Sequence, residues 1–220
     1  MKNIKAIIFD AYGTLFDVNS AAEKCKDKIG GKWEAFANFW RTTQLEYTWL
    51  RSLMERHKDF WLITEDSLDK SMKAFNIDLS MKDELLNLYK VLSPYKEVPE
   101  TLKTLKEKKF KLAILSNGTP SLLNELVKSN NLEDLFDDIF SIEEVKIYKP
   151  DSRVYNIPIK KYQIEKSEVA YLSSNTWDLS ASGNYGFNPV WVNRNNNIFD
   201  NLDYVPKYQI DNLSKLIDIV

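Results

Sequence analysis

The segment Lys5–Thr14, KAIIFDAYGT, shows the pattern from which the fold can be predicted. The apolar residues Ala6 to Phe9 run without interruption into Asp10, and Gly13 follows in a short turn. An apolar run of this length that stops at a turn is typical of a strand buried on both faces of a parallel sheet. The chain is therefore expected to open with a buried strand whose end delivers Asp10.

Further apolar runs of the same kind recur along the chain. They cover Lys111–Leu115, Ile139–Ile142, Val169–Leu172 and Pro189–Val192. Segments with helical spacing lie between them, at Glu100–Lys108, Ser121–Ser129, Arg153–Tyr162 and Leu179–Tyr185. Strands that alternate with helices predict an α/β fold, here a doubly wound, Rossmann-like parallel sheet.

Residues 17–93 interrupt this alternation, because they contain no convincing strand and several amphipathic stretches, beginning with the aromatic cluster Trp33–Trp40. We therefore expect an inserted helical cap subdomain at 17–93 and a sheet domain formed by residues 1–16 and 94–220. Pro94 and Pro99 flank the return to the sheet and predict a stiff hinge. Asp17 and Ser20 are expected to cap the first inserted helix.

The composition is that of an ordinary globular protein: of 220 residues, 44% are hydrophobic and 28% are charged. Lys and Arg number 30 against 32 Asp and Glu, so the net charge of -2 gives no electrostatic reason to expect nucleic acid or a membrane as partner. The first residues do not resemble a signal peptide, and Cys25 has no second cysteine to pair with. The sequence therefore predicts a cytoplasmic protein with Cys25 in the core or an interface.

Polar side chains follow four of the predicted strands at the point where each strand ends. They are, in chain order, Asp10 with Thr14, Ser116 with Asn117, Lys149, and Ser173 with Asn175 and Asp178. In a doubly wound sheet these strand ends face one crevice. Alone, Asp10 would be interpreted as a turn cap and Lys149 as a solvated surface residue. Together these residues favour a functional site, because a set of motifs is more specific than any member.

Four short motifs carry a family resemblance: DAYGT at 10–14, SNG at 116–118, KPD at 149–151 and SSNTWD at 173–178. Their order and loop positions resemble the signature motifs of the haloacid dehalogenase superfamily. The details are similar to its L-2-haloacid dehalogenases, and the resemblance continues through RTTQLEYTWLRSLM at 41–54. It covers nearly the whole chain.

The number of acids separates two chemistries within this superfamily. Its phosphatases carry a second acid in the first motif and a further one in the fourth, which hold Mg²⁺ and protonate a leaving alcohol. Tyr12 and Ser174 stand at those positions here. We therefore expect a site without metal or cofactor. The alternatives are a Mg²⁺-dependent phosphatase or phosphonate hydrolase, and a non-catalytic binding module that keeps the fold.

The resemblance implies hydrolytic dehalogenation of short L-2-haloacids, with water as the second substrate. The Asp10 carboxylate would attack the α carbon, expel halide with inversion and form an ester, which water would hydrolyse to a D-2-hydroxy acid. A halide leaves without a proton but needs a pocket lined with donors. His57, the chain's single histidine, is expected to face solvent and to take no part.

The resemblance also implies residue roles. Arg41 and Asn117 would receive the halide, Ser116 would hold the substrate carboxylate, and Lys149 would orient Asp10 and keep it ionised. Asp178 would position or deprotonate the hydrolytic water. Supporting hydrogen bonds are expected from Thr14, Tyr155, Ser173 and Asn175, and an apolar wall from Tyr12, Leu45, Phe60 and Trp177. The family often forms homodimers, and the aromatic run Trp33–Trp49 is compatible with such an interface.

Overall fold

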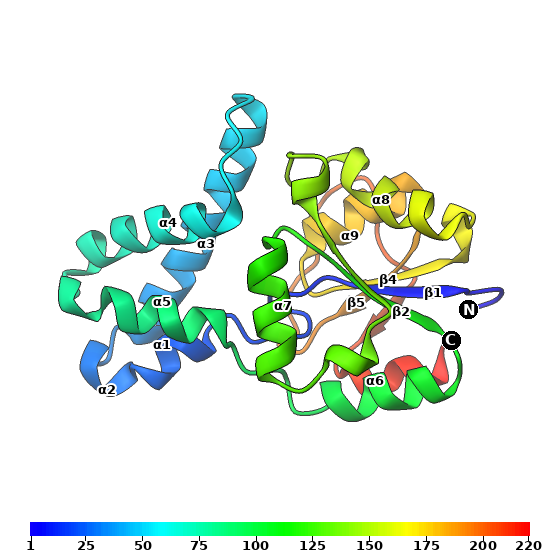
Figure 1. The fold of residues 1–220 in the computed structure, drawn as a ribbon, viewed down its shortest axis with the longest axis horizontal. Coiled ribbons are helices and arrows are strands. Elements are labelled where there is room, and N and C mark those ends of the chain that lie inside the picture. Colours follow the sequence, from blue (N-terminus) through cyan, green and yellow to red (C-terminus); the bar gives the residue numbers. More distant parts are fainter.

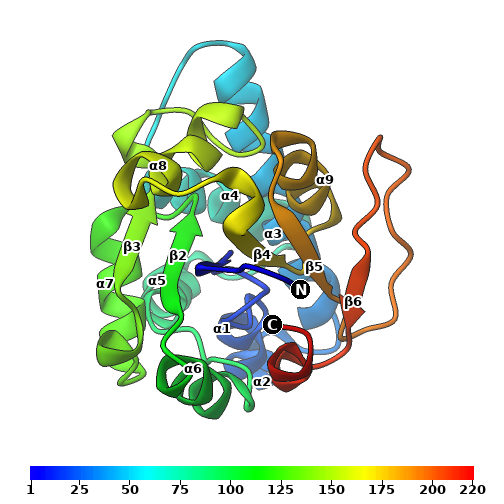
Figure 2. The same ribbon diagram turned by 90° about the vertical axis from the view of Figure 1, so that its right-hand side faces the viewer.

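The computed structural model describes residues 1–220 and contains one six-stranded sheet. Its strands are β1 (Ala6–Phe9), β2 (Lys111–Ser116), β3 (Asp138–Ser141), β4 (Val169–Ser173), β5 (Asn188–Val192) and β6 (Tyr208–Ile210). They lie in the order β3-β2-β1-β4-β5-β6, and every neighbouring pair is parallel (Figure 2). The winding reverses between β1 and β4, so a crevice opens at the carboxyl ends of these two strands.

Strand β1 lies inside the sheet, between β2 and β4, so its backbone and its side chains are both enclosed. All four of its residues are buried, as the uninterrupted apolar run predicts. Phe9 lies beside Ile114 of β2 on one side and beside Leu172 of β4 on the other. This register carries the backbone directly from the core into the crevice, where Asp10 N–H donates to the Leu172 carbonyl at 2.8 Å.

Helices cover both faces of the sheet, which confirms the doubly wound α/β prediction. They are α6 (Val98–Glu107), α7 (Pro120–Ser129), α8 (Ser152–Tyr162) and α9 (Thr176–Tyr185). Helices α8 and α9 lie over one face, and α6 lies over the other together with the 3₁₀ segment Leu213–Asp218 (Figures 1 and 2). Side-chain caps start two of these helices: Thr119 Oγ1 accepts from Leu122 N–H at 3.3 Å, and Asp151 Oδ1 accepts from Arg153 N–H at 2.9 Å.

Residues 20–90 form a purely helical segment beside the sheet. It contains α1 (Ser20–Lys24), α2 (Lys26–Ile29), α3 (Trp33–Leu53), α4 (Phe60–Phe75) and α5 (Lys82–Lys90), which gather at one end of the molecule (Figure 1). The two chain crossings that join it to the sheet lie side by side. Asp17 N–H donates to the Ser93 carbonyl at 2.8 Å, and Tyr95 N–H donates to the Leu15 carbonyl at 3.0 Å. These two adjacent crossings form one narrow connection, and the part of the site near it is called the hinge side.

One expectation about helix capping was wrong, and one strand was not predicted. Asp17 and Ser20 do not cap α1: Asp17 Oδ1 accepts from Asn19 N–H at 2.9 Å in a local turn, and Ser20 is already inside the helix. The pattern also missed β6, which has three residues, too few for a period of two to be visible against the polar stretch before it.

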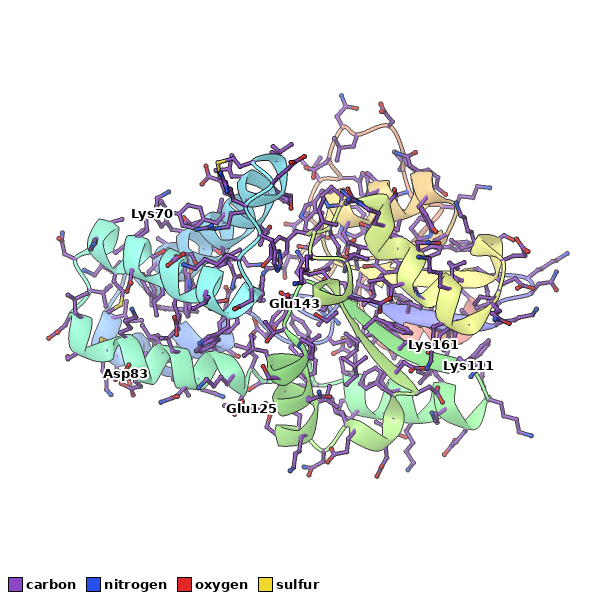
Figure 3. The ribbon with its side chains drawn as sticks, turned by 45° about the horizontal axis from the view of Figure 1, so that its top comes forward. Lys70, Asp83, Lys111, Glu125, Glu143 and Lys161 are labelled. Atoms are coloured by element: carbon purple, nitrogen blue, oxygen red, sulfur yellow. The ribbon has the colours of Figure 1, made fainter.

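His57 does not face solvent freely, contrary to expectation. Its side chain is 23% exposed, and its Nε2 lies 3.0 Å from Glu143 Oε2. Figure 3 shows Glu143 where the sheet domain meets the helical segment. The pair therefore joins these two parts of the molecule, a contact between residues distant in sequence that no local pattern announces.

The core is continuous and apolar, and Cys25 is buried in it, as expected. None of the helices combines the length and the apolar character needed to cross a membrane.

Candidate active site

The Asp10 carboxylate lies at the switch point between β1 and β4 and is held by a ring of donors. Its Oδ1 accepts from Lys149 Nζ at 3.0 Å. Its Oδ2 accepts from Asn175 Nδ2 at 2.9 Å, Thr14 Oγ1 at 3.1 Å and Ser173 Oγ at 3.5 Å. Asp10 is only 6% exposed, so these bonds replace most of its hydration. Hydrogen bonds to both oxygens hold this carboxyl group in one fixed orientation.

Lys149 joins Asp10 to the second carboxylate of the site. Its ammonium lies 3.0 Å from Asp10 Oδ1, 3.1 Å from Asp178 Oδ2 and 2.6 Å from the Tyr171 hydroxyl, and the residue is 1% exposed. An ammonium has three N–H donors, so each has one partner. Lys149 therefore lies at a fixed point between two carboxyl groups.

Asp178 is fully buried beneath this ammonium, and it accepts from two phenols. Oδ1 accepts from the Tyr155 hydroxyl at 2.7 Å, and Oδ2 accepts from the Tyr171 hydroxyl at 2.8 Å. Burial raises the pKa of Asp178 above its usual value, although the charge of Lys149 opposes this effect. Burial, and then the charge of Asp178, raise the pKa of Tyr155 and Tyr171, so both phenols stay neutral donors.

Tyr171 belongs to this site, and the sequence reading missed it. It lies in the middle of β4, whose other residues are small or aliphatic except for the terminal serine. A buried tyrosine needs a partner for its hydroxyl. That requirement was the available signal, but the sequence alone does not say which partner lies within reach.

Three other predicted polar residues of the site, Asn117, Ser116 and Arg41, make no hydrogen bond to Asp10. Asn117 Oδ1 accepts from Lys149 N–H at 3.1 Å, which leaves the amide Nδ2 of Asn117 free to donate. Ser116 is fully buried, and its Oγ accepts from Gly118 N–H at 3.1 Å. Arg41 enters from α3: its Nη1 donates to Gln44 Oε1 at 2.9 Å, and its Nη2 donates to the Tyr12 carbonyl at 3.4 Å. Three N–H donors of the guanidinium are left for an anion.

Three cavities have predicted site residues in their lining, and two of them reach Arg41 or Lys149. One, of about 240 Å³, lies on the hinge side, and Tyr12, Arg41, Leu45 and Asn175 line it. The other, of about 570 Å³, lies between the far end of α3 and the sheet domain, and its lining includes Lys149 and Trp177. Phe60, nominated as a wall residue, is fully buried, with its ring 5.3 Å from that of Tyr12. Phe60 therefore supports the wall from behind.

The residues of this site do not fit a magnesium ion. The ammonium of Lys149 lies between the two carboxyl groups of Asp10 and Asp178. The position two residues after Asp10 holds Tyr12, whose pKa is raised by burial. A neutral phenol and an ammonium are poor companions for a hard dication. No three His, Cys, Asp or Glu side chains lie together in an arrangement that could hold a metal.

Comparison with known proteins assigns this architecture to a family. Residues 4–186 match the family model described as haloacid dehalogenase-like hydrolase. The (S)-2-haloacid dehalogenase of Pseudomonas sp. (strain YL) is 38% identical over 221 residues, which cover 100% of this chain and 95% of the relative. The chain belongs to the haloacid dehalogenase-like hydrolases, among the (S)-2-haloacid dehalogenases.

Other members of the family agree in sequence and in structure. (S)-2-haloacid dehalogenase 1 of Pseudomonas sp. (strain CBS-3) is 41% identical, over 98% of this chain and 96% of the relative. The L-2-haloacid dehalogenase from Xanthobacter autotrophicus, solved with chloropropionic acid covalently bound, superposes with a TM-score of 0.91 at 31% identity, over 98% of each chain. The match therefore extends through both the sheet and the helical segment.

Proposed function

We propose that this protein hydrolyses the carbon–halogen bond of short L-2-haloacids and releases halide and a D-2-hydroxy acid. The observation that carries the proposal is the placement of Asp10: a carboxylate fixed by Lys149, whose ammonium lies between it and the second carboxylate of the site, Asp178. Such a group is suited to attack carbon directly. The membership of the chain in the (S)-2-haloacid dehalogenases supports the same reaction.

In the first step an Asp10 oxygen attacks the α carbon from the side opposite the halogen. A new C–O bond forms, the carbon–halogen bond breaks, and the halide leaves with the bonding electron pair, so the carbon inverts and an ester links it to Asp10. Arg41 and Asn117 carry the unused donors of the site and receive the halide. Ser116 holds the substrate carboxylate. Donors fixed before the reaction stabilise the developing anion without rearranging.

In the second step a water oxygen adds to Cγ of the Asp10 ester, and the bond between Cγ and the oxygen that carries the substrate then breaks, so Asp10 returns as a carboxylate with one oxygen from water. One proton of the water goes to Asp178 and the other ends on the substrate oxygen, which departs as the hydroxyl of the product; the bond to the α carbon is untouched, so its configuration is retained in this step. Burial makes Asp178 a stronger base than a solvated aspartate, because it raises the pKa. Tyr155 and Tyr171 keep this base oriented.

The predicted apolar residues form the wall of the pocket around the substrate's side chain. Tyr12 and Leu45 line the hinge-side cavity, Phe60 packs behind Tyr12, and Trp177 closes the opposite side. We propose that the helical segment, residues 17–93, acts as a cap on the sheet domain, residues 1–16 and 94–220. Exclusion of water by such a cap strengthens the electrostatic interactions inside the site.

We also propose a homodimer built on the end of α3. Leu50, Leu53 and Met54 are 43%, 81% and 58% exposed there, and this end of the helix projects from the molecule (Figure 1). The larger, partly apolar cavity lies beside it. An exposed apolar patch next to a groove is typical of a subunit interface. Leu53→Asp is expected to give a monomer in sedimentation experiments at micromolar concentration.

The unpaired, buried Cys25 suits the reducing cytoplasm, where we propose that the protein works.

One assay tests the reaction class. L- and D-2-chloropropionate are supplied separately with a chelator present, and chloride release is followed. Turnover of the L form alone, unaffected by the chelator, is expected. Release of phosphate from phosphate esters, with a Mg²⁺ requirement and no release of chloride, would instead establish the phosphatase alternative, which the donor set does not favour.

A further inference from the structure

Gln44 fixes the guanidinium of Arg41 from inside the helical segment. Its side chain is 1% exposed, and its Oε1 accepts from Arg41 Nη1 at 2.9 Å. We propose that Gln44 is a positioning residue for the leaving group: it holds Arg41 where the departing halide will be. This inference rests on the proposed function, and it concerns a residue that the sequence reading did not single out.

The orientation of the Gln44 amide follows from its neighbour Thr64. The Thr64 hydroxyl donates its single proton to the Phe60 carbonyl at 2.7 Å, so it can only accept from Gln44. Gln44 Nε2 lies 2.7 Å from that hydroxyl and is therefore the donor. The amide oxygen must then point the other way, toward Arg41. A flipped amide would place two donors, Nε2 and Nη1, against each other.

The Tyr89 hydroxyl completes the enclosure of the amide. It lies 3.0 Å from Gln44 Nε2 and 3.3 Å from Oε1, and its ring stacks on Tyr12 with a centroid distance of 5.7 Å. Burial raises the pKa of both Tyr12 and Tyr89, so neither phenol carries a charge. The Arg41 guanidinium itself is bound at two points, by Gln44 Oε1 of the helical segment and by the Tyr12 carbonyl in the Asp10 motif.

This arrangement matters because an arginine side chain is long and flexible. Binding two of its five N–H donors leaves three aimed in fixed directions, and only preorganised donors stabilise charge as it develops in the transition state. Loss of one such donor typically lowers kcat by about 10² to 10³. A change that loosens this donor without removing it is expected to lower kcat by less, on the order of tenfold.

The test compares two leaving groups in single turnover. Gln44→Met keeps the length of the side chain and removes the acceptor. We expect chloride release from L-2-chloropropionate to slow by about tenfold and bromide release from L-2-bromopropionate to slow less, because bromide needs less assistance. The bromide-to-chloride rate ratio should therefore rise at least about threefold, with little change in the substrate concentration at half-maximal rate.

A matched control separates positioning from a general loss of cap stability. Ser71→Ala removes another buried hydroxyl of α4, one that donates to the Ser67 carbonyl at 2.7 Å and has no contact with Arg41. It should leave the rate ratio unchanged even at an equal loss of thermal stability. Thr64→Val, which removes only the hydroxyl that orients Gln44, should shift the ratio in the same direction by a smaller amount, and it serves if Gln44→Met fails to fold.

A double-mutant cycle completes the test. In an Arg41→Ala background Gln44→Met should have no further effect on the rate ratio, because residues that act through one another are not additive. An unchanged ratio in both the Gln44 and Thr64 variants, or a full effect in the absence of Arg41, would overturn the inference while the proposed function stands. A wild-type protein that releases no halide from either substrate would overturn both.

Discussion

Replacing Lys149 by Met tests the electrostatic core of the site. The substitution keeps most of the buried side-chain volume and removes the one cation between Asp10 and Asp178. In the wild-type protein the Lys149 ammonium lies 3.0 Å from Asp10 Oδ1 and 3.1 Å from Asp178 Oδ2. Two carboxylates would then face each other in a buried site with no counterion. Loss of one partner from a buried ion pair typically costs about 3–5 kcal/mol of the free energy of unfolding.

This loss depends on pH in a direction that the structure decides. The charge of Lys149 lowers the pKa of Asp178 and opposes the effect of burial, so its removal raises that pKa further. A raised pKa means that the folded state binds the proton more tightly than the unfolded state, so the stability of Lys149→Met falls as the pH rises through the folded pKa. The deficit against wild type is therefore larger at high pH than at low pH. It should shrink on acidification by about 1.4 kcal/mol for each unit of additional shift.

Urea denaturation of both proteins at pH 5 and pH 8 measures the deficit, and halide release measures catalysis. We expect kcat to fall by at least about 10³, because Asp10 loses its orienting cation. Lys5→Met is the matched control: Lys5 is 61% exposed in its pair with Glu168, and the loss of such a surface pair costs about 1 kcal/mol or less. An equal deficit at both pH values, or more than a tenth of the wild-type kcat, would refute this account of Lys149.

Three further predictions concern single groups of the site. Asp10→Asn should abolish turnover and leave the circular dichroism spectrum unchanged, and in wild-type single turnovers in ¹⁸O water the first label should enter Asp10, found by mass spectrometry of its peptide, rather than the product. Arg41→Gln should lower kcat by about 10²; a change confined to KM would mean that Arg41 only binds substrate. Because the raised pKa of Asp178 must be exceeded for the base to be free, kcat should fall on the acid side at a pH above 3.8. Tyr155→Phe removes a hydrogen bond that lowers this pKa, so it should move the acid limb upward, and a downward shift would contradict the assignment of Asp178 as the base.

Asp10 and Lys149 could both be named from the sequence, but for different reasons. Asp10 directly follows a buried apolar run, whereas Lys149, which lies eight residues beyond the end of β3 at Ser141, was identified by the KPD motif of the family resemblance. The parallel sheet then brings their side chains together, since the carboxyl ends of its strands share one edge. The expectation that His57 faces solvent failed for a related reason: its partner, Glu143, belongs to the other part of the molecule.

Residues that act through others were beyond the reach of pattern. Gln44 lies on a helix rich in polar residues, where a glutamine is normally interpreted as part of a solvated face. It is buried because α4 and α5 bring Thr64 and Tyr89 against it. In the sequence Tyr171 resembles an ordinary core aromatic residue. Only the structure shows that the Lys149 ammonium lies 2.6 Å from its hydroxyl.

The class of fold, the order of the first five strands with the helices between them, and the polar residue types near the strand ends follow from the amino-acid sequence. These depend on hydrophobic period and turn residues, which are local properties. Tertiary structure alone decided which donors are already engaged, which remain free for a substrate, and which carboxylate is buried enough for its pKa to rise. Hydrogen bonds and desolvation depend on atoms a few ångströms apart in space, such as those of Asp10 and Lys149, whose separation along the chain is 139 residues.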